Sequence, residues 1–197
     1  MRRAFVYRLY PTPAQRKRLD SVRETCRRWY NTCLAERIEA WDEYSVGISY
    51  YDQQRGVKIL KRENPFAKTV HTHCLQGATK DLDLAFKAFF RRCKSGEAPG
   101  YPRFKARHRF AGFGFQEYGN GAKVDGRRLR IFGVGRLAVR WHREMQGTPK
   151  TVRIVRKADG WYAAFSCEVP LPVPLPPSGE TVGLDLGITH LVATSDG

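Results

Sequence analysis

Hydrophobic and polar residues alternate over the first ten positions of the chain, and this pattern predicts a β-strand. In "AFVYRLYP", Phe5, Tyr7 and Leu9 fall on one face of an extended segment. Pro11 ends the run, because proline has no backbone N–H to give to a strand ladder. The sequence therefore predicts a strand over residues 1–11.

The next stretch changes to a helical spacing. "TPAQ" is typical of a helix start, with Thr12 as N-cap and Gln15 as its capping-box partner. A second helical stretch is expected from about residue 50 to 62, and a third from near residue 68 to Gly96. We expect residues 12–94 to form a small helical unit. The first helix places one apolar stripe toward a core: Leu19, Val22, Cys26, Trp29 and Cys33.

From residue 101 the period becomes two. "YPRFKARHRFAGFGFQ" would, as a strand, align four cations along one edge and continue into two glycine-spaced aromatic residues. Such a surface suits a nucleic-acid backbone with stacked bases, and the alternative is an edge strand whose charges prevent aggregation. The candidate contact residues are Arg103, Lys105, Arg107, Arg109, Phe113 and Phe115.

Four further strands are expected in "RRLRIF", "RLAVRWH", "KTVRIVRKA" and "WYAAFSCEV", with turns at Asp125-Gly126 and Asp159-Gly160. Together they predict an α+β protein: one β-barrel or compact sheet from residues 1–11 and 100–170, into which the helices are inserted. "PLPVPLPPSGE", with its five prolines, then indicates a stiff linker at about 171–180.

Charge points to a polyanionic partner. The chain has 35 Lys and Arg against 19 Asp and Glu, a formal net charge of +16. Arg27 and Arg28 lie largely off the apolar stripe of the first helix, where they either face solvent or contact phosphates. No apolar run is long enough for a bilayer, and "MRRAFVYRLYP" is broken too early for a secretory signal, so no membrane partner and a cytoplasmic location are expected.

The cysteines offer little for metal or disulfide chemistry. There are five, with no C-x-x-C pair, so we expect neither a disulfide framework nor a zinc site. "HTHC" at residues 71–74 lacks a second ligand pair, and partly buried helix residues are the favoured interpretation.

The last segment carries a candidate catalytic acid. "TVGLDLGITHLVATSDG" reads as a β-hairpin in which Asp185 stands between two glycines on an open face. An acid between glycines can equally be a turn residue without chemistry. Phosphodiester cleavage by two metal ions needs several converging carboxylates, which one aspartate does not supply.

Several of these pieces, taken in order, resemble TnpB, the transposon-encoded protein of the IS200/IS605 group and a smaller relative of Cas12 nucleases. They are "AFVYRLYPTPAQ", "RRWYN", "AFKAFFR", "GYPRFK", "VRIVRKADGWYAAFSCEV" and "VGLDLGITHLVATSDG", which together span nearly the whole chain. The resemblance is to the N-terminal half of that family.

The resemblance implies a fold, partners and a cofactor. It implies a wedge-like β-barrel (1–11 and 100–170), a helical recognition insert (12–99), a linker (171–180) and the first hairpin of an RNase H-like nuclease domain of RuvC type (181–197). It also implies a guide RNA from the transposon end, a double-stranded target DNA and Mg²⁺ held partly by Asp185, the family's first catalytic carboxylate. The family's later carboxylates and its zinc ribbon have no counterpart here.

The leading hypothesis is a guide-RNA- and DNA-binding half of an RNA-guided DNA endonuclease, truncated after its first RuvC motif and unable to cleave alone. Its exposed terminal hairpin would then need a partner surface, in this chain or another. The alternatives are a nuclease-dead RNA-guided or plain DNA-binding repressor, and an RNA-binding protein of ribosomal or structural type.

Overall fold

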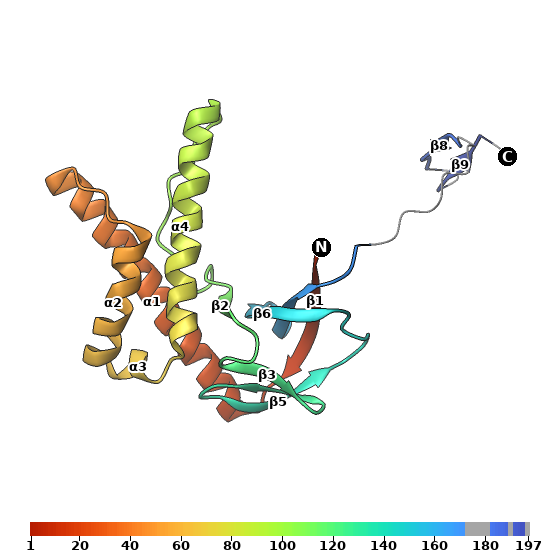
Figure 1. Cartoon of the computed structure of the whole chain (residues 1–197), viewed down its shortest axis with the longest axis horizontal. Helices are drawn as coiled ribbons and strands as arrows, with labels where there is room; N and C mark the ends of the chain where they lie inside the picture. Colours follow the sequence, from red (N-terminus) through yellow and green to blue (C-terminus); the bar gives the residue numbers. More distant parts are fainter. Residues whose placement is uncertain (172–181, 189–190, 196–197) are drawn as a thin grey trace.

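The computed structural model describes residues 1–171, 182–188 and 191–195, and in this part of the chain a seven-stranded sheet is joined to four helices (Figure 1). All neighbouring strands of the sheet are antiparallel, in the order β2-β6-β7-β1-β5-β4-β3. The strands are β1 (Arg2–Tyr10), β2 (Gly112–Phe115), β3 (Ala122–Asp125), β4 (Arg128–Ile131), β5 (Gly135–Arg140), β6 (Thr148–Lys157) and β7 (Gly160–Glu168).

The helices follow β1 directly, as the sequence pattern predicts. They are α1 (Pro13–Tyr44), α2 (Tyr50–Glu63), α3 (Pro65–Lys68) and α4 (Thr72–Ser95). The predicted capping box is present: the hydroxyl of Thr12 accepts from the backbone N–H of Gln15 at 3.3 Å, and the Gln15 side chain accepts from the Thr12 N–H at 3.0 Å. Gly96 ends α4 with a φ of 72°, the left-handed geometry expected of a C-cap glycine.

The strand β1 lies at the centre of the sheet, although it comes from the opposite end of the chain to its neighbours. Phe5 is paired with Phe165 on β7, and Leu9 with Val139 on β5. The alternation read from the sequence is confirmed, because the side chains of Phe5, Tyr7 and Leu9 are at most 2% exposed. The two halves of the sequence therefore share one core.

The helices pack mainly against the β2 end of the sheet, although Gln15 of α1 also donates to the Arg136 carbonyl of β5 at 3.1 Å. Gly77 of α4 approaches the backbone of Gly114 on β2, where a Cβ atom would lie 3.5 Å from the carbonyl oxygen. Asp81 of α4 forms an ion pair with Arg153 of β6 at 2.6 Å. These contacts leave the β1-β5-β4-β3 part of the outer sheet face without a helix over it (Figure 1).

The sheet does not close into the predicted β-barrel. Strands β2 and β3 are its two edges, so it forms a curled half-barrel (Figure 1). Four residues in each edge strand give too few ladder hydrogen bonds to hold a closed seam. The turns predicted at Asp125-Gly126 and Asp159-Gly160 are confirmed, because they join the paired strands β3 and β4 and the paired strands β6 and β7.

The predicted basic strand over residues 101–110 is wrong. Within this region only Gly112–Phe115 forms a strand, and a turn closed by a hydrogen bond from the Arg109 N–H to the Ala106 carbonyl at 3.0 Å lies before it. The physical reason is competition for the backbone groups of this segment, which bond to side chains of α1 instead of to a neighbouring strand.

The terminal segment contains the predicted hairpin in a shorter form. Strand β8 (Leu184–Asp185) pairs antiparallel with β9 (Ala193–Thr194), and Asp185 lies opposite Ala193. Its apolar residues Leu186 and Ile188 are exposed. The predicted proline-rich linker falls almost wholly on residues 172–181, outside the described residues. No helix in the described residues is long and apolar enough to cross a bilayer.

Candidate nucleic-acid interface

Side chains of α1 hold the basic segment of residues 101–111, named here the strap, against the helix. Arg23 is only 7% exposed, and its Nη1 donates to the backbone carbonyls of Arg107 at 2.9 Å and Phe110 at 3.0 Å. Asn31 bonds both backbone groups of Lys105, donating to its carbonyl at 3.1 Å and accepting from its N–H at 2.8 Å. The strap backbone is therefore fixed although only its last residue, Ala111, bonds a strand, accepting from the Arg156 N–H of β6 at 2.8 Å.

The two candidate arginines of α1 have different roles. Arg27 is 19% exposed and bonds both oxygens of Glu24 as well as the Lys105 carbonyl, so it serves the strap. Arg28 is 73% exposed and shares Glu24 through its Nε alone, which leaves most of its guanidinium in solvent. The hydrogen bond from Arg27 lowers the pKa of Glu24 to about 2, with a further contribution from Arg28.

The candidate aromatic residues do not face solvent. Phe113 and Phe115 are 2% and 1% exposed, and both belong to the core. Because β2 alternates, its phenylalanines pack beside Ile154 and Val152 of β6, whereas the intervening Gly114 meets α4. A base cannot stack on these rings without unfolding the sheet edge, and this part of the sequence interpretation is corrected.

The strap still presents cations. Arg103, Arg107 and Arg109 are exposed, and Lys105 is half-buried, with its ammonium 5.8 Å from the centre of the Tyr30 ring. They do not form a straight row along an edge, because the backbone turns at residues 107–109. Whether they contact nucleic acid stays a prediction.

A denser group of cations lies on the outer face of the sheet, which is the face opposite the buried side chains Leu129, Ile131 and Leu137. The sequence pattern did not predict this group. The backbone register sets Lys123 of β3 opposite Arg130 of β4, and Arg130 opposite Arg136 of β5. All three side chains are exposed. Like charges directly opposite one another destabilise a sheet. Three cations in one row therefore lower the stability of the fold, and a bound anion would offset their repulsion. We name this row the cation ladder.

The rows beside the cation ladder extend its charge. Arg128 follows on β4, and Arg8 of β1 is paired with Arg140 of β5. The guanidinium of Arg8 lies 5.7 Å from the ring of Tyr10, whose side chain is 50% exposed. Two acids temper this charge: Asp125 pairs with Arg136 at 3.0 Å and Asp159 with Arg8 at 3.5 Å. The face nevertheless keeps a cationic excess beside exposed aromatic rings. Cations can bind the phosphates of a nucleic acid, and aromatic rings can stack on its bases.

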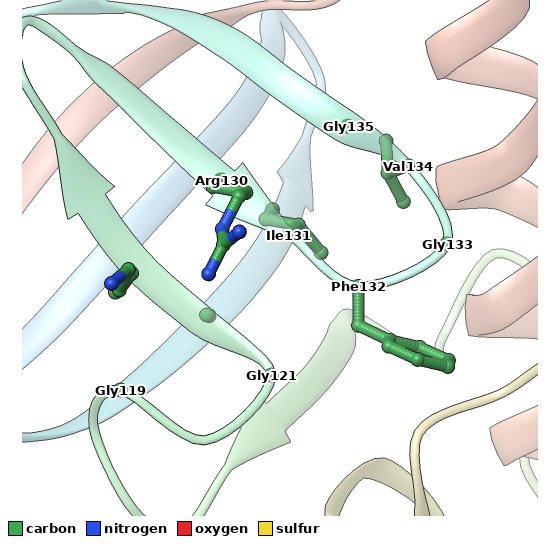
Figure 2. A pocket seen from close by; sticks show the side chains of 10 residues that line it. Gly119, Gly121, Arg130, Ile131, Phe132, Gly133, Val134 and Gly135 are labelled. Atoms are coloured by element: carbon green, nitrogen blue, oxygen red, sulfur yellow. The ribbon is translucent and has the colours of Figure 1, made fainter.

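The outer end of the cation ladder borders a hollow of about 520 Å³. Figure 2 shows Arg130 pointing into it, with Gly119 and Gly121 on one side and Gly133 and Gly135 on the other. Gly121 has a φ of 90°, and a Cβ atom there would lie 2.8 Å from the Phe115 ring. Only glycine fits this turn, because the Phe115 ring already fills the space that a Cβ atom would take.

The segment "RRLRIF" has the two-residue period of a strand. Arg128 and Arg130 alternate there with Leu129 and Ile131, which are buried. The alternation puts the two arginines on one face, but it does not say which residues stand beside them. That depends on the register with β3 and β5, which is set by the hairpins.

Asp185 is exposed on β8. In the described residues no three His, Cys, Asp or Glu side chains come together as metal ligands. The described residues therefore do not make a two-metal site around Asp185, which is a single carboxylate. The "HTHC" cluster is divided: Cys74 is buried, and His71 caps α4 by accepting from the His73 N–H at 3.2 Å.

Comparison with known proteins gives one family-model match and two relatives. A model of a helix-turn-helix domain, of the OrfB IS605 type, matches residues 1–45. The chain is 30% identical over 198 residues to InsQ of Escherichia coli (strain K12), which is named as an RNA-guided DNA endonuclease, covering 98% of this chain and 47% of InsQ. A protein named as an RNA-guided DNA endonuclease in Streptomyces pristinaespiralis is 31% identical over 204 residues, covering 100% of this chain and 49% of that protein.

The chain thus spans about half the length of the curated relatives it matches. Among solved structures, a chain of the Cas12f1–sgRNA–target DNA complex is similar to this chain, with a TM-score of 0.46 and 13% sequence identity. The match covers 99% of this chain and 54% of that chain.

Proposed function

We propose that this chain, a TnpB-like protein, forms the guide-RNA-binding and DNA-binding part of an RNA-guided DNA endonuclease. The observation that carries the proposal is the cation ladder. Lys123, Arg130 and Arg136 stand side by side at a cost to the sheet, and a phosphate backbone is the partner that would relieve it. The two relatives named as RNA-guided DNA endonucleases support the same activity for the complete protein.

The division of labour in such proteins follows from the chemistry of the surface. Arginine and lysine side chains on an outer sheet face can follow phosphates without reading bases. Sequence specificity would then come from base pairing between guide RNA and one DNA strand, with the protein holding the backbone. In this proposal the half-barrel corresponds to the wedge-like domain, and the helices α1 to α4 to the recognition insert.

The hairpin of β8 and β9 would be the first element of an RNase H-like nuclease domain of RuvC type. Asp185 would be its first catalytic carboxylate and one ligand of Mg²⁺ in a completed site. Two short strands cannot bury an apolar face alone, and Leu184, Leu186 and Leu191 are all more than two-thirds exposed, at 69%, 79% and 86%. A further nuclease segment, or a partner chain, would cover them.

The test begins with binding. The purified 197-residue chain is titrated with RNA transcribed from the region beside its own gene, and with a scrambled RNA of the same length and predicted pairing. We expect the native RNA to bind at least about tenfold more tightly at physiological salt. Equal affinity for both RNAs would contradict guide recognition and favour a general RNA-binding protein.

A second assay adds Mg²⁺ and a DNA duplex that matches the guide. We expect DNA binding without cleavage, because the described carboxylates do not form a two-metal site. Cleavage that disappears in Asp185→Asn would show instead that this chain is a complete nuclease. A nuclease-dead repressor predicts the same assay result, but the gene downstream of Gly197 would then lack a second acidic motif and paired C-x-x-C.

A further inference from the structure

An aromatic pocket lies between the C-terminal parts of α1 and α4, away from the cation ladder. It has a volume of about 420 Å³. Three of its rings are unusually exposed for their size: Trp41 at 61%, Phe90 at 55% and Tyr101 at 46%. The residues that line it are Arg37, Trp41, Gly47, Ile48, Phe86, Phe89, Phe90 and Tyr101.

The wall of the pocket is held in place by ring contacts. Tyr101 meets Phe86 at a centroid distance of 5.6 Å and an angle of 87°, and meets Phe89 at 5.2 Å and 78°. The rings of Phe86 and Phe90 are 6.3 Å apart and nearly parallel, at 29°. Edge-to-face and offset pairs of this kind are favourable, so the wall exists before any ligand arrives.

Arg37 gives the pocket a polar group with an unmet donor. Its guanidinium lies 5.0 Å over the Phe86 ring, and its Nε donates to Gln53 at 2.8 Å. Its Nη2 is buried and has no hydrogen-bond partner in the described part of the chain. A buried donor is costly to leave unpaired, so a shift of the Arg37 side chain that brings Nη2 to a ring-edge acceptor of a ligand in the pocket would be favourable.

Flat aromatic walls, a guanidinium donor and nearby cations, set against the acid Asp42 that follows Trp41, define a narrow class of ligand. Arg91 and Lys94 follow Phe90 on α4 and are exposed, and Arg103 follows Tyr101 on the strap. An apolar peptide side chain would fill the volume without meeting the donor or the charges. A nucleobase has two π-faces, ring-edge acceptors and a phosphate attached, and so matches all three features.

We propose that this pocket takes one unpaired base of a bound RNA, stacked on Trp41 and Phe90 and hydrogen-bonded to Arg37. The inference rests on the proposed function, in that the chain must bind RNA. RNA is preferred over target DNA because structured RNA displays unstacked bases in loops and bulges, whereas bases of a DNA duplex are paired and stacked.

The test compares two RNAs and three proteins. One RNA is a stem closed by a loop of unpaired bases, and the other has the same length and is fully paired. The double variant Trp41→Ala/Phe90→Ala is set beside the wild type and beside Tyr51→Ala/Phe66→Ala, which removes two aromatic side chains of similar exposure, 71% and 67%, outside the pocket.

We expect the pocket variant to lose about tenfold or more in affinity for the looped RNA and to bind the paired RNA as the wild type does. The control variant should match the wild type on both. An unchanged affinity for the looped RNA would overturn the pocket while leaving RNA binding intact, and a wild type that binds neither RNA would overturn the proposed function itself.

Two further arms fix the occupant. Single-stranded DNA of the same loop sequence should bind more weakly and be less affected by the pocket variant. An equal or larger effect with DNA would overturn RNA as the source of the base. Arg37→Lys keeps the charge but removes the planar donor pair, so it should weaken looped-RNA binding, while an unaltered affinity would remove Arg37 from the proposal.

Discussion

Asn31 and Lys105, 74 residues apart in the chain, are joined by both hydrogen bonds that an amide can exchange with one backbone unit. The Asn31 side chain accepts from the Lys105 N–H at 2.8 Å and donates to its carbonyl at 3.1 Å. The side chain thus takes the place that a neighbouring strand would occupy, and the strap is fixed to α1 without belonging to the sheet.

Replacing Asn31 with alanine should release the strap. The Lys105 carbonyl keeps Arg27 as a donor, at 2.8 Å, but its N–H loses its acceptor. We expect the free energy of unfolding to fall by about 1–2 kcal/mol, measured by urea denaturation. Trypsin should also cut faster at Arg103 and Arg107. Thr32→Ala, at the neighbouring exposed position of α1, is the control. Equal rates of proteolysis in the two variants would contradict the role of Asn31 in holding the strap.

Neutralising part of the cation ladder should weaken binding without weakening the fold. In Lys123→Gln/Arg130→Gln we expect nucleic-acid affinity to fall and the slope of log affinity against log salt to become shallower by about 1–2. Because these cations repel across the strands, thermal stability should stay level or rise slightly. Lys17→Gln/Lys58→Gln removes the same charge from exposed helix positions.

The result against the cation ladder would be a similar loss of slope in both double variants, since that would indicate a response to net charge alone. A clear drop in melting temperature in Lys123→Gln/Arg130→Gln would also count against it, because it would mean that the two cations stabilise the sheet.

The exposed strap arginines form an independent site if they contact phosphates. The triple variant Arg103→Gln/Arg107→Gln/Arg109→Gln should bind RNA more weakly and show a shallower salt slope by up to about 3. Lys105 is left in place because its ammonium packs over Tyr30. Filter-binding titrations between 50 and 300 mM salt, roughly the range in which counterion release is resolved, would measure the slope. Unchanged affinity and slope would return these arginines to the role of solvated surface charges.

Glu24 should make stability depend on pH in the acid range. Its carboxyl is held by Arg27 and Arg28, which lowers its pKa from 4.5 to about 2. A carboxyl with a lowered folded-state pKa stabilises the fold while it is ionised, so its contribution is complete above about pH 4.5 and is lost as the pH falls toward 2. Glu24→Gln should therefore cost about 1–3 kcal/mol at pH 6 and almost nothing near pH 2.

Urea denaturation at several pH values would measure this difference between wild type and variant. A difference that stays constant from about pH 6, above both pKa values, down to about pH 2.5, close to the lower one, would mean that Glu24 acts through packing and not through its charge.

Local patterns were read correctly wherever the deciding interactions are close in sequence. The strand ended by Pro11, the capping box of Thr12 and Gln15, and the C-cap at Gly96 all depend on neighbours a few residues away. The short helix α3 was not predicted. Asn64 both ends α2 and caps α3, so the stretch "ENPF" at residues 63–66 ends one helix and begins the next.

The strap shows where such reading fails. Its alternating "RFKARHRF" fits a strand, but alternation measures only which side chains share a face. It does not show whether a second strand is available to pair with. In the structure, the side chains of Arg23 and Asn31 on α1 bond the backbone groups of the strap instead. Phe113 and Phe115 were misread for the same reason, since which face of β2 is buried depends on α4 and β6.

The sequence by itself determined most of the elements, the excess of positive charge and the candidate acid Asp185, because spacing and composition are properties of the chain. Only the tertiary structure decided which cations stand together. Lys123, Arg130 and Arg136 come from three strands, and their alignment exists only in one register of two hairpins. A shift of one residue would turn the same charges into the core, and burial of Leu129 and Ile131 is what forbids it.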